Sequence, residues 1–348
     1  MLTVIRSAAV LLATAGSVTA DDPIAHRPLT PRQAAEGWVM LFDDRTTFGW
    51  TVDGEAKVTD DGLVLGGTKE TVATTDAAFG GYGQVVVIFR RFGKGIPVAS
   101  WQEGHQNLAD TVPNEEVVSR AELYGRPDRS GPIRVRVPAG TRLELRGAFY
   151  KPGGTTPLFN GKDLTGWKRY TGDPKREKSK FEVTPAGELH LTDGSGDLQT
   201  EKTFADFLLQ LECKTNGPGL NSGVFFRGLP GQYQQGYEAQ IHNRFKDGDR
   251  TKPTDFGTGA IYRRIPARKV VANDGEWFTL TVLANGPHLA TWVNGYPTVS
   301  WTDDRKPAEN ARQGLYTKAG VISLQGHDPT TDLLFRNIKI AEMERGKR

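Results

Sequence analysis

Short runs of alternating apolar and polar residues, separated by turns that contain glycine and proline, dominate this chain. Its 348 residues include 41 glycines and 20 prolines, and long stretches of strong helix-forming residues are missing. Arg142–Arg146 (Arg-Leu-Glu-Leu-Arg) shows the pattern clearly, because successive side chains of a strand point to opposite faces of a sheet. No alternation of strand and helix patterns is present, which argues against a parallel α/β architecture. We therefore expect an all-β fold made of antiparallel sheets.

One segment near the start of the chain recurs later. Gly37–Trp50 and Thr156–Trp167 both contain Leu-Phe, then a polar turn, then Gly-Trp at the same offset. A repeated domain-opening strand indicates two units of related design. Between them, Lys151–Thr155 has the composition of a linker. We predict a smaller, sandwich-like accessory β-domain over 36–150, a linker over 151–155 and a larger antiparallel β-sandwich over 156–345.

The two predicted units differ in how many strands they contain. The first has clear strand patterns at 84–90, 133–137 and 142–146, and its polar segment 101–131 is expected to form a long loop. The second has a denser series of short strands with turn residues between them, which favours a two-sheet sandwich. Its strand candidates are 181–183, 188–191, 207–214, 223–227, 236–241, 277–283, 288–293, 320–324 and 333–340.

The first twenty residues are organised like a secretory signal peptide. Arg6 supplies the positive end, Ala8–Ala15 is an apolar run too short to span a bilayer, and Val18–Ala20 is a small-residue cleavage site. The alternative is a short membrane anchor; no later segment approaches transmembrane length. We expect a secreted or periplasmic protein whose leader, 21–35, ends in a short helix. Thr30–Gln33 carries the capping signature of that helix.

Charge and cysteine content exclude several classes of function. The net charge is +3, and no basic run or arginine stripe indicates a nucleic-acid partner. Cys213 is the only cysteine, so the chain has no internal disulfide. Cys213 shares its parity with Leu209 and Leu211 in an alternating strand pattern, which favours a buried packing role over a thiol nucleophile.

An ordered series of short segments in the second unit carries a family resemblance. The segments are Leu158–Trp167, Asn221–Arg227, Gly236–Gln240, Thr258–Tyr262, Gly275–Trp277, Trp292–Gly295, Gly320–His327 and Phe335–Ile338. In this order they resemble the 3-keto-disaccharide hydrolase family, also described as the 3-keto-glucoside 1,2-lyase/3-keto-2-hydroxy-glucal hydratase domain and formerly a domain of unknown function. The resemblance implies a concanavalin-like, jelly-roll antiparallel β-sandwich. The first unit shares only the opening strand, and so resembles an accessory copy.

Two departures from the family pattern concern the second unit. Phe181 stands where tryptophan is usual, and the stretch 243–257 is a charged loop that borders the expected site. Neither change removes a candidate catalytic group. They leave the identity of the glycoside open.

A row of polar residues follows one predicted strand of the second unit. Glu238 and Gln240 are two apart, so their side chains point to the same face, and His242 continues that row. The row indicates a lined concave surface; the alternative is a solvated outer face, which antiparallel sheets often expose. Arg227 ends the preceding strand, where it either neutralises and orients Glu238 or lies on the surface.

A second polar pair lies at the end of another strand. Gln325 and His327 are two apart, and a histidine in this position suits acid–base chemistry or metal binding, the alternative being a structural histidine. Asn221 and Tyr262 are candidate sugar contacts, because planar polar groups and aromatic rings match the hydroxyls and C–H faces of sugars. The tryptophans expected in the cores are Trp50, Trp167 and Trp277.

The chemistry that the resemblance implies starts from a sugar oxidised at C3. The ketone acidifies the C2 hydrogen, a base removes it, the C1 substituent is eliminated, and water adds to give net hydrolysis. Glu238 and His327 are the candidate catalytic residues, and the resemblance names no certain cofactor. The residues expected to bind the substrate are Asn221, Arg227, Gln240, His242, Tyr262 and Gln325. A divalent metal is an alternative source of enolate stabilisation, with Glu238, His242 and His327 as its ligands.

Two other functions are compatible with the same residues. A non-catalytic carbohydrate-binding β-sandwich would have a similar polar face, because fold does not determine function. A purely structural envelope protein would neither bind nor cleave glycans. The expected partner of an enzyme or binding module is a small-molecule or oligosaccharide ligand.

Overall fold

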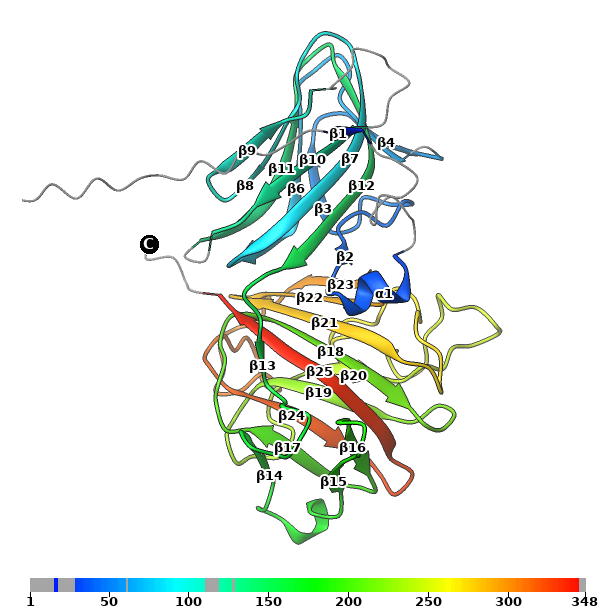
Figure 1. Cartoon of the computed structure of the whole chain (residues 1–348), viewed down its shortest axis with the longest axis vertical. Helices are drawn as coiled ribbons and strands as arrows, with labels where there is room; N and C mark the ends of the chain where they lie inside the picture. The colour runs from blue at the N-terminus through cyan, green and yellow to red at the C-terminus, as the bar shows by residue number, and fades with distance from the viewer. Residues whose placement is uncertain (1–15, 18–28, 61, 110–118, 127–128, 344–348) are drawn as a thin grey trace, which may run out of the picture.

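The computed structural model describes residues 16–17, 29–60, 62–109, 119–126 and 129–343, and these residues form two stacked groups of antiparallel sheets (Figure 1). The expectation of an all-β, antiparallel sandwich fold is therefore confirmed. Most of the predicted signal peptide, 1–20, lies outside the described residues. Within them, no helix has both the length and the apolar character needed to cross a membrane.

The N-terminal part forms two antiparallel sheets. The larger has the order β1-β10-β7-β12-β5-β4, with β2 paired to β12, and the smaller has the order β3-β6-β11-β8-β9. The strands of the larger sheet are β1 (Gly16–Ser17), β2 (Val39–Met40), β4 (Ala56–Thr59), β5 (Gly62–Leu65), β7 (Gly83–Phe92), β10 (Ser119–Tyr124) and β12 (Arg142–Pro152). Those of the smaller are β3 (Trp50–Asp53), β6 (Thr71–Gly80), β8 (Val98–Trp101), β9 (Gly104–Asn107) and β11 (Ser130–Val137).

The C-terminal part also forms two antiparallel sheets. The larger has the order β15-β16-β25-β18-β21-β22-β23, with β13 paired to β25, and the smaller has the order β14-β17-β24-β19-β20. The strands of the larger sheet are β13 (Thr156–Pro157), β15 (Lys180–Val183), β16 (Leu189–Thr192), β18 (Phe207–Thr215), β21 (Phe278–Asn285), β22 (His288–Val293), β23 (Tyr296–Thr302) and β25 (Asp332–Glu342). Those of the smaller are β14 (Trp167–Arg169), β17 (Gly196–Thr200), β19 (Ser222–Gly228), β20 (Tyr237–Ile241) and β24 (Val321–Gly326).

Two expectations about local structure have clear outcomes. The helix α1 (Pro31–Ala35) begins with the expected capping box, in which the side chains of Thr30 and Gln33 each bond to the other's backbone N–H; a short 3-10 helix, η1 (Pro174–Arg176), precedes β15. The prediction of one long loop over 101–131 is wrong, because the strands β9 and β10 lie within that range. β9 has no alternating apolar residues and lies exposed at the edge of its sheet, so its sequence carries no strand signal.

The repeated opening segment has the same structure in both parts. The indole N–H of Trp50 donates to the carbonyl of Leu41, and that of Trp167 donates to the carbonyl of Leu158, in each case across nine residues. The strand pairings that follow also repeat, since β3–β6 and β5–β12 correspond to β14–β17 and β16–β25. β12 continues to Pro152, into the predicted linker, and the domain boundaries stay a prediction.

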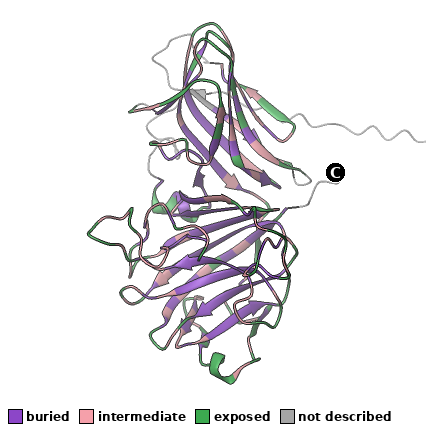
Figure 2. Cartoon of the chain, turned by 180° about the vertical axis from the view of Figure 1, so that it is seen from behind, coloured by how far each residue is buried: buried purple, intermediate pink, exposed green. Residues whose placement is uncertain are grey.

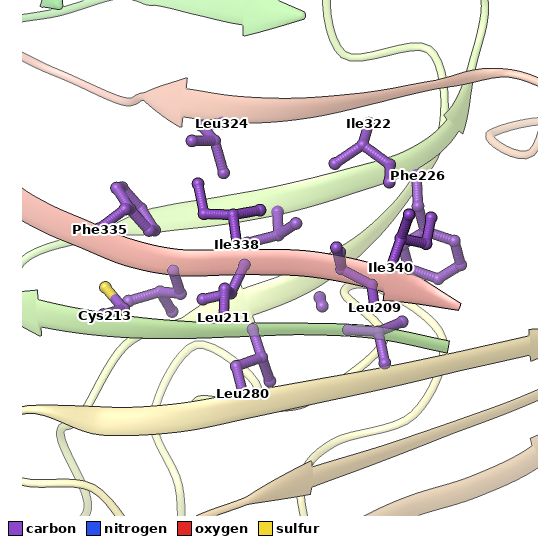
Figure 3. Close-up of a cluster of buried hydrophobic side chains, with 14 of the residues drawn as sticks. Leu209, Leu211, Cys213, Phe226, Leu280, Ile322, Leu324, Phe335, Ile338 and Ile340 are labelled. Atoms are coloured by element: carbon purple, nitrogen blue, oxygen red, sulfur yellow. The ribbon is translucent and has the colours of Figure 1, made fainter. Parts of the chain in front are cut away.

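The core of the C-terminal sandwich lies between its two sheets. Apolar residues from β18, β25 and β24 interdigitate there, as the close-up shows (Figure 3). Cys213 is fully buried among them, which confirms the packing role expected for it. Trp50 and Trp167 are buried as expected. Trp277 is only half-buried, and the guanidinium of Arg336 lies over its ring at 3.9 Å.

The N-terminal part covers the outer face of the larger C-terminal sheet. Met40 donates its backbone N–H to the carbonyl of Gly295 at 2.8 Å, and its own carbonyl accepts from the indole of Trp292 at 2.9 Å. Leu208 and Leu283 of that outer face belong to the N-terminal core. Buried residues accordingly run through the strands of both parts, while much of the connecting loops is intermediate or exposed (Figure 2). The smaller C-terminal sheet is therefore the one whose outer face is free for a ligand.

Candidate functional site

The outer face of the smaller C-terminal sheet is polar. Phe225 pairs with Glu238 and Gly223 with Gln240, so the two polar side chains of β20 share one face, as expected from their spacing. The register continues this face onto the neighbouring strands β24 and β17. The polar residues that it adds are Asp197, Gln199, Ser323 and Gln325. Ala239, Leu324 and Leu198, on the alternate positions, face the core.

A cavity of about 410 Å³ lies over this polar face. Its volume is within the range typical of small-molecule sites. The side chains around it come from β20 and β24 and from the loops that follow β14, β18, β19, β20, β23 and β24. They are Arg176, Asn221, Tyr233, Gln234, Gln235, Glu238, Tyr262, Arg263, Arg312, Gln325 and His327. Of the residues predicted from the sequence, the structure thus brings together Glu238, His327, Asn221, Tyr262 and Gln325.

Glu238 is a buried carboxyl group, with 5% of the residue exposed. Its Oε2 accepts a hydrogen bond from the Arg312 guanidinium at 3.1 Å. Burial raises the pKa of Glu238 to about 7; the positive charge of Arg312 opposes this shift, and the carboxylates of Asp197 and Asp255 add to it. A carboxyl group that titrates near neutral pH is well suited to proton transfer.

Gly223 makes room for the Glu238 side chain. A Cβ atom at this position would lie 2.6 Å from Oε1 of Glu238 and 2.9 Å from its Cγ. Both distances are too short for any side chain, so the glycine of the Asn221-Ser-Gly segment allows Glu238 to lie flat against the sheet. The structure therefore gives this segment a steric role that its sequence did not reveal.

His327 lies directly after β24, at the rim of the cavity. Its Nδ1 is 2.8 Å from Oδ2 of Asp328, and 40% of its side chain is exposed. The backbone N–H of His327 donates to the Thr331 hydroxyl at 3.0 Å, which fixes the turn that presents the ring. A partly exposed imidazole beside a carboxylate can exchange protons with both a ligand and solvent.

Asp255 joins two of the predicted binding residues. Its Oδ2 accepts from the amide of Asn221 at 2.7 Å and from the amide of Gln240 at 2.9 Å. Asp255 belongs to the charged loop 243–257, which therefore does border the site. Gln240 lies next to the cavity and not in its wall, since its amide is committed to Asp255.

The predicted role of Arg227 is wrong. Its side chain is completely buried, forms an ion pair with Asp206 at 2.8 Å and donates to the carbonyls of Ala205 and Gly286. A break in strand register after Phe225 and a φ of 51° at Arg227 turn this side chain away from the polar face. Arg312, and not Arg227, contacts Glu238.

The three side chains named as alternative metal ligands, Glu238, His242 and His327, do not assemble into one site. Both ring nitrogens of His242 are within hydrogen-bonding distance of groups outside the cavity, Nδ1 of the Leu220 carbonyl at 3.3 Å and Nε2 of the Thr254 hydroxyl at 3.1 Å. His242 is thus separated from Glu238 and His327 and does not line the cavity. Across the described ranges, no three His, Cys, Asp or Glu side chains converge in a way that could hold a metal ion.

Several residues of the site were not found from the sequence. Arg312 and Tyr233 lie in loops without periodicity, so no sequence signal marks them. Asp197, by contrast, alternates with Leu198 and Gln199 on β17, and this alternation was a usable signal. Burial raises the pKa of Asp197 to about 7, although its Oδ2 accepts the backbone N–H of Gln234.

The chain is similar to a curated protein and to solved structures. A curated 3-keto-disaccharide hydrolase of Bacteroides thetaiotaomicron is 25% identical, with the match covering 55% of this chain and 79% of that protein. A crystal structure of a Parabacteroides distasonis protein, assigned provisionally as a glycosyl hydrolase, is 24% identical with a TM-score of 0.44, covering 55% of this chain and 94% of the other. A second structure from that organism is 25% identical with a TM-score of 0.42, covering 55% and 100%.

The family assignment rests on the sequence pattern of the C-terminal part. The pattern of the 3-keto-alpha-glucoside-1,2-lyase-like domain matches residues 154–341, more than half of the 348 residues, and this range includes all the residues around the cavity. The resemblance noted from the short segments is confirmed. The chain therefore belongs to the family of 3-keto-alpha-glucoside-1,2-lyase-like domains.

Proposed function

We propose that the protein is a carbohydrate-active enzyme that cleaves 3-keto-glycosides by C2 deprotonation, elimination of the C1 substituent and rehydration. One observation carries the proposal: Glu238, a buried carboxyl group with a pKa raised to about 7, lies in the wall of a polar cavity. The family of the chain and the name of its Bacteroides relative, 3-keto-disaccharide hydrolase, support the choice of a glycoside as substrate.

Glu238 is the base in this proposal. The C3 ketone acidifies the C2 hydrogen. A carboxylate whose pKa is near neutral is a strong enough base to take that proton, and at neutral pH a large fraction of it is still ionised. The burial that raises the pKa also strengthens electrostatic interactions inside the cavity. The C2–H electron pair then forms the enolate, and the Arg312 guanidinium beside Glu238 offsets its developing negative charge.

His327 is the acid that assists departure of the C1 substituent. As the enolate collapses, the C1–O bond breaks, a C1–C2 double bond forms, and protonated His327 gives a proton to the leaving oxygen. Asp328 at 2.8 Å stabilises the protonated ring. Neutral His327 then takes a proton from water, whose hydroxyl adds to C1. Glu238 exchanges its proton with solvent and then gives a proton to C2. The sum is hydrolysis, with both side chains restored.

Amide groups around the cavity position the sugar. The Oε1 atom of Gln325 is buried and has no hydrogen-bond partner among the described residues, so a sugar hydroxyl can donate to it. Tyr262, half-buried in the same wall, is held by its backbone N–H, which donates to the Glu238 carbonyl at 2.9 Å. An aromatic face and an amide in one wall suit the apolar and polar sides of a pyranose.

Export is part of the proposal. The charged end, apolar run and small-residue site within residues 1–20 support it. Sequencing the N-terminus of protein recovered from the cell envelope or medium tests this element separately. A mature N-terminus at Asp21 is expected, and an intact Met1 on cytoplasmic protein would contradict it.

The test of function is turnover of a glucose disaccharide oxidised at C3 on one ring. We expect the wild type to release the second sugar, measured by chromatography, and Glu238→Gln to lower the rate by about 10²- to 10⁴-fold, the usual contribution of a positioned base. Glu182→Gln makes the same change at an exposed position of β15 and should leave the rate unaltered. Circular dichroism and melting curves verify that both variants are folded.

Two results would contradict the proposal. The first is full turnover by Glu238→Gln. The second is the absence of turnover by the wild type while the same disaccharide still binds, which would favour a non-catalytic carbohydrate-binding module.

A further inference from the structure

A short loop crosses the polar face next to the Glu238 cavity. This loop, residues 229–236, joins β19 to β20 and is held by two side chains of β17. Gln199 accepts the backbone N–H of Gly231 at 3.1 Å and donates to the carbonyl of Gln232 at 2.9 Å. Asp197 accepts the backbone N–H of Gln234 at 3.2 Å. Because both anchoring side chains are buried, the loop is a fixed partition and not a loose cover.

A second cavity, of about 490 Å³, lies on the other side of this loop. It is formed by the end of β14, the strand β17 and the loop itself, and its wall includes Lys168, Tyr170, Gln199, Glu201 and Gly231. Gln199 lies in the wall of the second cavity. The residue that anchors the loop 229–236 therefore also lies between the two cavities. The volume is of the size that accommodates small organic ligands, as is that of the first cavity.

Two tyrosine rings connect the cavities. Tyr170 lines the second cavity and Tyr233 lines the first, and their ring centroids are 5.5 Å apart. The Arg176 guanidinium covers the Tyr233 ring at 4.9 Å, which fixes the pair from the side of η1. Adjacent aromatic faces flanked by charged and amide groups form a surface along which successive sugar rings can pack.

We propose that the second cavity is a subsite for a sugar ring of the group that leaves from C1. This inference rests on the proposed function and narrows its substrate class to 3-keto-oligosaccharides, with the oxidised ring beside Glu238 and a further ring against Tyr170. Lys168 and Glu201, which face each other at 3.5 Å on the exposed edge, supply a donor and an acceptor for hydroxyls of that ring.

The test compares two 3-oxidised ligands, methyl α-glucoside and an α-linked glucose trisaccharide. In wild-type background, Tyr170→Ala should raise KM for the trisaccharide about five- to tenfold, the size of one lost aromatic contact, and leave KM for the methyl glycoside unchanged. Tyr170→Phe should retain trisaccharide affinity. Tyr82→Ala removes an exposed tyrosine of the N-terminal part and serves as the matched control.

A second variant tests the subsite independently, in case Tyr170→Ala does not fold. Thr171→Trp places a large side chain at an exposed position of the second cavity, and it should also weaken binding of the trisaccharide alone. Calorimetry of both ligands in the Glu238→Gln background measures affinity without turnover. A selective loss for the trisaccharide in that experiment supports the subsite even if the wild type proves inactive.

The subsite and the catalytic proposal can thus fail separately. Equal losses for both ligands, or unchanged trisaccharide affinity in Tyr170→Ala and Thr171→Trp, would overturn the subsite whether or not the wild type cleaves its substrate. Absence of binding by either ligand in calorimetry would also overturn it.

Discussion

The two sandwiches share their strand pairings but differ in what covers the smaller sheet. In the N-terminal part, β8 and β9 are joined by the two-residue turn Gln102–Glu103, and the outward side chains of β11, Arg134 and Arg136, are exposed. In the C-terminal part, the loop 229–236 joins the corresponding strands, and the outward side chains of β24, the counterpart of β11, are buried (Ser323 and Gln325).

This difference shows that the chemistry of the site comes from the loops and not from the sandwich. Burial is the largest cause of the raised pKa values of Glu238 and Asp197. An identical carboxyl group on the uncovered N-terminal face would keep its ordinary pKa, since water would solvate its charged form. The same scaffold thus presents a solvated surface in one part and a cavity with titrating carboxyl groups in the other.

The largest expected effect concerns the buried ion pair of Arg227, the arginine that was predicted from the sequence to lie in the site. Arg227→Met removes the positive charge that neutralises the buried Asp206 carboxylate, which should lower the free energy of unfolding by about 3–5 kcal/mol. Arg136→Met breaks the ion pair with Glu70 on the N-terminal sheet, where both side chains are exposed. This change should leave the free energy of unfolding unaltered within error. Chemical denaturation measures both. Comparable losses in the two variants would contradict the structural role of Arg227.

Next in size is the effect of filling the space beside the catalytic carboxyl group. Gly223→Ala should displace the Glu238 side chain and reduce kcat by about 10²-fold, the effect expected from an ångström-scale misplacement. Gly131→Ala on β11 is the matched control, because its added Cβ would find no atom closer than 3.8 Å. Initial rates with the 3-oxidised disaccharide make the comparison. Equal rates for Gly223→Ala and the wild type would contradict the claim that Gly223 makes room for the Glu238 side chain.

A smaller effect is expected in the pH dependence. Glu238 must be unprotonated to act as a base, so kcat/KM should fall as the pH drops below about 7. Arg312→Met removes the charge that lowers the pKa of Glu238, so the acid limb should move to higher pH and activity at pH 7 should drop about tenfold or more. A limb that stays in place, or moves to lower pH, would show that Glu238 does not control it.

The smallest effect tests the part that the two sandwiches share. Trp50→Phe and Trp167→Phe each remove the indole N–H that donates to a carbonyl nine residues earlier. Each change should lower the free energy of unfolding by about 1 kcal/mol, the value of one buried hydrogen bond. Thermal melts of the two variants should shift alike. A large loss at only one position would mean that the repeated segment has different roles in the two parts.

Much of the fold could be predicted from the sequence because its signals are local. Alternation of apolar residues identified the long strands, and the Leu-Phe and Gly-Trp repeat identified the opening turn of both parts. β9 was missed because an exposed edge strand buries no apolar side chains. The shared face of Glu238 and Gln240 followed from their spacing alone.

The composition of the site was harder to predict because it depends on long-range placement. Arg312 reaches Glu238 from a loop 74 residues further along the chain, and no local pattern encodes that contact. Arg227 was misplaced because a break in strand register cannot be read from alternation. His242 continues the row of Glu238 in sequence, yet β20 ends at Ile241, and the chain turns away after it.

The central claim is that Glu238 removes the C2 proton before the glycosidic bond breaks. Turnover of the 3-oxidised disaccharide in D₂O, followed by NMR of the released 3-keto sugar, tests it most directly. The account predicts that the wild type introduces deuterium at C2 faster than it enters in a sample without enzyme. Glu238→Gln should introduce no more deuterium than that background. Cleavage by the wild type with the original hydrogen retained at C2 would contradict it.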